Sequence, residues 1–270
     1  MEGISQGQNA LRDLQRKLSK SNPWPPLFPA KVHLKHLPTD QTFVDTLHMP
    51  LPHEICSAVA RWNQDAGDKP FTAAGLTPKV RQHCLSFCQD HNRDPSKTFP
   101  LGFWIDGVPV KWDRSESMIV LTLNFPGQVD NDFKRLRIPI ALVNKKFLVE
   151  ETMQDLLNII AWSFTCLHAG FFPSTPLPGQ DPFHGWRQKQ CGKPLGAHGM
   201  LIEARGDWEA YKNFFGLAGW NDKTCCYRCQ ASSTNSRDPS LEASWVSQMK
   251  TLWRHLRKPN LFHLCFPSPV

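Results

Sequence analysis

Tyrosine is scarce in this sequence, with only two residues against ten Trp and 17 Phe in a chain of 270. Three other features are also missing: an internal repeat, a glycine-rich loop that could cradle a phosphate, and a Ser or Cys motif typical of an activated nucleophile. These absences argue against a repeat protein, a P-loop nucleotide hydrolase and a serine or cysteine hydrolase.

No long hydrophobic run is present either. The most apolar stretch, from Leu156 to Phe172, is short for a membrane span and is interrupted by Asn158, Ser163, Thr165 and His168, so we expect a buried helix and no membrane partner. The chain begins with polar residues, which predicts no secretory signal, and its nine Cys then favour reduced thiols or metal ligands over disulfides. We therefore expect an intracellular protein.

Charge and composition indicate a globular protein with an acidic partner. Hydrophobic residues make up 40% of the chain, and 23 Pro predict many short connections. A formal charge of +7 fits a partner with negative charge, of which nucleic acid is the commonest. A soluble protein that is merely basic has the same balance.

The sequence pattern changes near Phe99. Residues 1–98 read as a small, Pro-rich helical region. Strand patterns then cover residues 101–112, 118–125 and 137–143. A capping-box-like pattern from Thr152 to Asp155 predicts the start of a helix, and Gly170 predicts its end. A fourth strand pattern covers residues 199–205. This order predicts an α/β fold: an incomplete RNase H-like mixed sheet with crossover helices over residues 99–224, followed by residues 225–270 as a Cys-containing knuckle and basic segment.

Two acids fall at strand positions that this fold would bring together. Asp106 lies in the first strand of the sheet and Asp207 follows the fourth. If these strands are neighbours, the two carboxylates can bind Mg²⁺ or Mn²⁺, which activate water for attack on a phosphodiester. Each acid also has a structural reading, because Asp106-Gly107 is a hairpin-turn signal and Asp207 stands at a helix N-cap position.

The segments around these acids resemble a known family. Asp106-Gly-Val-Pro-Val, with the following Trp-Asp-Arg-Ser-Glu-Ser and a strand that ends in Asn-Phe-Pro, looks like the first catalytic segment of CACTA (En/Spm-like) transposases. Arg205-Gly-Asp-Trp208, continuing to Cys225-Cys-Tyr-Arg-Cys229, looks like the second. The chain is also similar to transposon-derived repetitive reading frames of protist genomes. This resemblance implies DNA as the partner, a nuclear location, and Asp106 and Asp207 as catalytic, metal-binding acids.

The chain departs from the family pattern at the third acid, which should lie on a later helix. The sequence ends at Val270 before such an element, and Glu242 stands in a segment that reads as a solvated helix start. We therefore expect a fragment of a DNA nuclease and strand-transferase domain that is inactive alone. The alternatives are a non-catalytic nucleic-acid-binding remnant and a Zn-stabilised interaction domain.

A Cys-x-x-Cys motif is the second candidate metal site. Cys226 and Cys229 have the spacing with which two thiolates bind one Zn²⁺. We take His255 as a further ligand; the other candidates are His263, Cys265, Cys191 and His198. Buried reduced Cys is the structural reading of the same motif. The Lys- and Arg-rich segment around Trp253 reads either as a phosphate-tracking face or as a solvated helix face.

Overall fold

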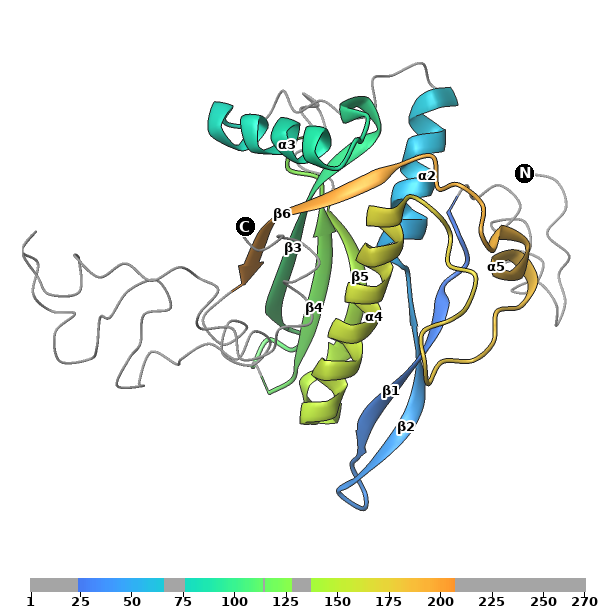
Figure 1. Ribbon diagram of the computed structural model, residues 1–270. Coiled ribbons are helices and arrows are strands. Elements are labelled where there is room, and N and C mark those ends of the chain that lie inside the picture. The colour runs from blue at the N-terminus through green and yellow to red at the C-terminus, as the bar shows by residue number, and fades with distance from the viewer. Residues whose placement is uncertain (1–23, 66–75, 114, 128–136, 207–270) are drawn as a thin grey trace, which may run out of the picture.

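The computed structural model of the chain describes residues 24–65, 76–113, 115–127 and 137–206 (Figure 1). They form a mixed α/β fold with a four-stranded sheet, a two-stranded hairpin and a central helix that contacts both. In chain order the elements are β1 (Phe28–His36), β2 (Gln41–Met49), α2 (Pro52–Asp65), α3 (Pro78–Asp90), η2 (Pro95–Lys97), β3 (Thr98–Pro109), β4 (Ser117–Asn124), β5 (Arg137–Asn144), η3 (Lys145–Phe147), α4 (Glu150–Ala169), α5 (Gly185–Gln190) and β6 (His198–Gly206).

The four-stranded sheet has the spatial order β5-β4-β3-β6. Strands β3, β4 and β5 are sequential antiparallel neighbours, whereas β6 returns parallel to β3 on its other side. A parallel return needs a crossover connection, and the segment that contains α4 supplies it. The predicted α/β class, the four strands and the crossover helix are confirmed.

Helix α4 is the longest helix described, and it runs roughly along the strands in front of the sheet (Figure 1). The helix starts at Glu150 with Val149 as N-cap, three residues earlier than the capping pattern with Thr152 as N-cap predicted. The Thr152 hydroxyl accepts a hydrogen bond from the Val149 amide at 3.0 Å, and Asp155 is bonded to His33 of β1 instead of acting as a cap. Gly170 ends the helix with a left-handed φ of 82°, as predicted.

The N-terminal region contains a hairpin that we did not predict from the sequence. Strands β1 and β2 pair antiparallel from Phe28↔Met49 to His36↔Gln41. Phe28, Ala30 and Val32 are buried and alternate with the partly exposed Pro29 and Lys31, which is the period of a strand. Pro-rich flanks concealed this period. Helices α2 and α3 agree with the helical character expected of residues 1–98.

One hydrophobic core joins the hairpin, α2, α4 and the sheet. The same buried cluster contains Val32 of β1, Ile55 of α2, Phe103 of β3, Leu121 of β4 and Ile160 of α4. The stretch that we expected to be a buried helix lies largely within α4, whose Leu156, Ile160 and Leu167 have no exposed surface. Among the described residues, no helix combines the length and the apolar character needed to cross a membrane.

Candidate functional site

Asp106 lies on the face of β3 opposite the core. Alternation along the strand sends Leu101, Phe103 and Ile105 into the core, while Trp104 and Asp106 are half-buried on the other face. Asp106 pairs with Val120 of β4, and β3 continues for three more residues, to Pro109. The Asp106-Gly107 pair is therefore inside a strand, and the hairpin-turn reading of it was wrong.

The described pairing of β3 with β6 ends one residue before Asp106. Strands β3 and β6 pair in parallel as far as Ile105↔Gly206. Asp106 is the next residue along β3, and in the sequence Asp207 is the next residue after β6. Asp207 lies outside the described residues. The predicted fold requires these two strands to be neighbours, and their adjacency in the sheet is confirmed.

Two arginines and an aromatic ring occupy the same sheet face. The guanidinium carbon of Arg137 lies 4.0 Å from the centre of the Trp104 ring, and Arg205 is the partner of Trp104 on β6. Both arginines are exposed. Glu203 is bonded to Arg205 at 2.6 Å, and a Cβ at Gly102 would lie 2.6 Å from its carboxylate oxygen, so Gly102 leaves the space that Glu203 fills.

Glu203 does not belong to a metal site with Asp106. Its register partner is Gly102, four residues before Asp106, which corresponds to about 13 Å along a strand. Its carboxylate is also already paired with a guanidinium. Within the described part of this face, Asp106 thus forms no ion pair with another described residue, and it lies on the same side of the sheet as two cationic side chains.

The predicted zinc ligands are not tested by the described residues. Cys226, Cys229 and His255 lie outside them, as do Glu242, His263 and Cys265. Two further candidates are described: the Cys191 thiol donates to the Arg187 carbonyl at 3.5 Å, and the His198 ring is bonded to the His168 carbonyl at 3.3 Å. Within the described residues no group of three or more His, Cys, Asp or Glu side chains could hold a metal ion.

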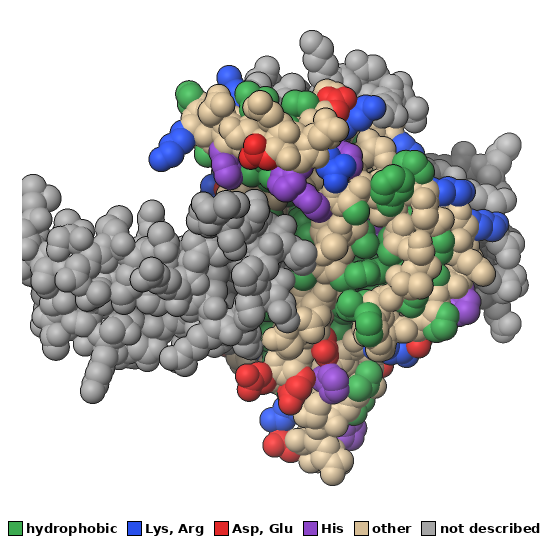
Figure 2. Space-filling model, in the orientation of Figure 1, with side chains coloured by type: hydrophobic (Ala, Val, Ile, Leu, Met, Phe, Trp, Pro, Cys, Tyr) green, Lys and Arg blue, Asp and Glu red, His purple; other side chains and the backbone are tan. Residues whose placement is uncertain are grey.

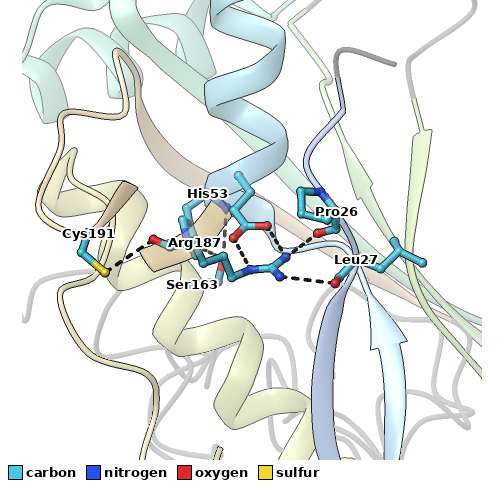
Figure 3. A network of polar contacts seen from close by, with 7 residues as sticks. Pro26, Leu27, His53, Ser163, Arg187 and Cys191 are labelled. Atoms are coloured by element: carbon cyan, nitrogen blue, oxygen red, sulfur yellow. Dashed lines mark hydrogen bonds and ion pairs between the residues drawn. The ribbon is translucent and has the colours of Figure 1, made fainter. Parts of the chain in front are cut away.

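A buried polar network joins α2, α5 and the start of β1 (Figure 3). Arg187 of α5 makes a bidentate pair with Glu54 of α2, at 2.7 Å and 2.8 Å, and also donates to the carbonyl groups of Pro26 and Leu27. Glu54 is 1% exposed. Burial raises the pKa of this carboxyl, although the hydrogen bonds and the charge of Arg187 act in the opposite direction.

His53 forms the second half of this network. Its backbone amide donates to Ser163 Oγ of α4 at 3.0 Å, and its ring Nδ1 lies 2.8 Å from the same oxygen. Burial, with a smaller contribution from the Arg187 charge, lowers the pKa of His53 to about 3. The ring is therefore neutral at physiological pH. Glu54 and His53 are as deeply buried as groups with a structural role usually are. Neither was singled out from the sequence, because their partners lie 133 and 110 residues away and leave no local signal.

Burial keeps the thiols of Cys56, Cys84 and Cys166 protonated. Burial raises the pKa of Cys84 to about 11 and that of Cys166 to about 12, and it also raises the pKa of the fully buried Cys56 thiol. A thiol in such surroundings stays protonated and inert. This agrees with the absence of a nucleophile motif in the sequence.

The hairpin that joins β3 to β4 carries apolar side chains into solvent. Val108 and Val110 are 42% and 54% exposed, and Trp112 is fully exposed. Lys111 and Lys146 both contact Glu116 at the base of this tip. An exposed aromatic ring such as Trp112 can stack on an unpaired base.

A search of protein-family models, curated proteins and solved structures found no match to this chain.

Proposed function

We propose that this chain is a transposase-like nuclease and strand-transferase fragment of the CACTA kind, built on an incomplete RNase H-like fold. The observation that carries the proposal is the register Ile105↔Gly206, because the next residue along each chain segment is an aspartate. Three antiparallel strands, a crossover helix and a fourth strand parallel to the first are the elements, in order, of an RNase H-like core. In this proposal Asp106 and Asp207 are the first two catalytic acids.

The proposed chemistry is metal-assisted attack on a phosphodiester. Neighbouring carboxylates bind Mg²⁺ or Mn²⁺, and the ion supplies an activated water and charge stabilisation for the leaving oxygen. Asp106 is half-buried on the sheet face away from the core, so its carboxylate can reach an ion without leaving the sheet. Two carboxylates are an incomplete ligand set for two ions, so we expect metal binding without turnover by this chain alone.

DNA is the proposed partner, and the exposed arginines beside the site support it. Arg137 and Arg205 lie on the Asp106 face and can contact phosphates, while the Trp104 ring holds Arg137 in place. The proposed location of such a protein is the nucleus. A zinc knuckle at Cys226, Cys229 and His255 stays part of the proposal, with a zinc assay of the purified chain as its test.

Metal binding distinguishes the proposal from a purely structural Asp106. We expect Mn²⁺ binding, measured by electron paramagnetic resonance, to weaken at least tenfold in Asp106→Asn and in Asp207→Asn. The double variant should lose less binding free energy than the two single variants combined, because the two acids share one ion. Asp45→Asn, on the exposed strand β2, is the matched control and should bind like the wild type. Equal Mn²⁺ binding by all four variants and the wild type would exclude the site.

DNA binding and cleavage need separate assays. We expect duplex binding to weaken steeply between 50 mM and 200 mM salt, with Arg137→Gln and Arg205→Gln each lowering the salt slope by about 1. Supercoiled DNA incubated with the 270-residue chain and Mn²⁺ should stay intact. Nicking that disappears in Asp106→Ala would show a complete active site, with Glu242 as the first candidate for the third acid.

A non-catalytic nucleic-acid-binding remnant is the second candidate. The exposed Trp112 at the β3–β4 tip favours it, because base stacking needs no metal ion. For this candidate, single-stranded DNA should bind equally well with EDTA and with Mn²⁺. Trp112→Ala should weaken that binding about tenfold, while Phe43→Ala, an exposed aromatic on β2, should leave it unchanged.

A further inference from the structure

Four cationic or titratable side chains from distant parts of the sequence meet below α3. His91 follows α3, Arg93 lies two residues later, His168 is near the end of α4 and His198 begins β6. The rings of His91 and His168 are 5.0 Å apart, and His198 is bonded to the His168 carbonyl. Figure 2 shows histidine side chains gathered on the surface below α3.

Arg93 brings an unsatisfied donor to this cluster. Its Nε atom is buried and has no hydrogen-bond partner among the described residues. A buried donor on a charged group costs free energy when it is left unpaired, and such atoms are rare in folded proteins. A bound acceptor would remove this cost.

The permanent charges that act on His198 are two positive and one negative. Lys97 adds a second permanent cation, and Asp94 is the carboxylate that the cluster faces. Asp94 is turned toward Ser96, whose amide and hydroxyl donate to its Oδ1 at 2.8 Å and 2.7 Å. Burial first, and then the neighbouring cations, lower the pKa of both His168 and His198.

We propose that the cluster of His91, Arg93, His168 and His198 is a binding site for a tetrahedral oxyanion of the phosphate or sulfate class. The anion accepts hydrogen bonds from the Arg93 guanidinium, after a side-chain shift that exposes its buried Nε, and from one or more of the imidazoles. A divalent cation does not suit the same cluster, because the Arg93 and Lys97 charges would repel it and no described group has metal-binding geometry.

This site is independent of the proposed function. Thr98, at the start of β3, pairs with His198, whereas Asp106 lies eight residues further along the strand, which corresponds to roughly 26 Å. Loss of the acids on one end of β3 therefore does not remove the oxyanion site at the other.

Anion binding should be coupled to protonation. Because His168 and His198 are mainly neutral at neutral pH, a bound anion has to raise their pKa, so its affinity increases as the pH falls. Sulfate is the suitable probe, since its own charge is constant between pH 8 and pH 6. If one proton is taken up, the affinity rises up to tenfold per pH unit above the histidine pKa.

The test is a sulfate titration of the full chain, followed through the histidine Hε1 signals by NMR. The signals of His91, His168 and His198 should move with one dissociation constant, and those of the exposed His48 and His184 should not. Arg93→Gln should weaken binding about tenfold or more, whereas Lys79→Gln, with the same charge change on the exposed surface of α3, should not. Equal effects of the two variants, or equal movement of all five signals, would overturn the site.

Two further arms complete the experiment. In sulfate-free buffer Arg93→Gln should be at least as stable to heat as the wild type, because it loses a buried donor without a partner. A clear loss of stability would mean that Arg93 is already satisfied and would overturn the proposal. A short DNA duplex that displaces sulfate identifies a backbone phosphodiester as the ligand, and a duplex that does not identifies a free oxyanion; both results require the site.

Discussion

At the residue scale, the buried ion pair of Glu54 and Arg187 should contribute strongly to the free energy of unfolding. The Glu54 side chain is 2% exposed and that of Arg187 is 11% exposed, so neither charge can return to water if its partner is removed. We expect Arg187→Ala to lower the free energy of unfolding by about 3–5 kcal/mol, as for other broken buried pairs. Lys189→Ala, an exposed residue of the same helix, should cost less than about 0.5 kcal/mol. Urea denaturation of both variants measures the difference, and similar values for the two would contradict the burial argument.

The burial of neutral His53 makes the stability of the folded protein depend on pH. The pKa of His53 is about 3 in the folded protein and near 6.5 in the unfolded chain, so between these values only the unfolded chain takes up the proton. Stability is thus fully present above pH 6.5 and is lost at about 1.4 kcal/mol per pH unit as the pH falls toward 3. Glu54, with its raised pKa, has the opposite sign, since its folded form binds the proton more tightly above pH 4.5. We expect His53→Gln to flatten the slope between pH 6.5 and pH 5; an unchanged slope would show that His53 can be protonated in the fold.

At the scale of secondary-structure elements, helix α4 packs closely against strand β6 at Gly199. A Cβ at Gly199 would lie 2.3 Å from Leu167 Cδ2 and 2.9 Å from Leu101 Cδ1, so a side chain at this position has no space. Gly199→Ala should destabilise the protein by about 1–3 kcal/mol. At Gly107 of β3 the nearest atom is the flexible end of Lys145, at 3.1 Å, and Gly107→Ala should be neutral or slightly stabilising. Thermal unfolding of the two alanine variants tests this order, and equal stability would show that α4 can move away from β6.

At the scale of the whole molecule, the hydrophobic core shared by the hairpin and the sheet should make the two unfold together. Val32 of β1 is fully buried in the cluster that also holds Phe103 of β3 and Leu201 of β6. Val32→Ala should lower the free energy of unfolding by about 2 kcal/mol. The amides of β3 and β6 should lose the same amount of protection from hydrogen exchange, because hairpin and sheet open together. Loss of protection confined to β1 and β2 would instead indicate two independently stable units.

The sequence by itself determined the elements of the sheet. Strands and helices with a strong local period, such as Met118 to Phe125 and the apolar helix ending at Gly170, are specified by neighbours a few residues apart. The same local information located Asp106 on a strand. It could not decide between a strand interior and a hairpin turn, because Asp-Gly is compatible with both until the strand partner is known.

Only the tertiary structure decided which distant residues became neighbours. The pairing of Ile105 with Gly206, the burial of Glu54 against Arg187 and the meeting of His91, His168 and His198 all join segments far apart in the chain. The hairpin was missed for a related reason: the buried period of Phe28, Ala30 and Val32 becomes decisive only when α4 supplies the surface that covers it. Local patterns encode periodicity, whereas burial and charge pairing depend on contacts that exist only after the chain has folded.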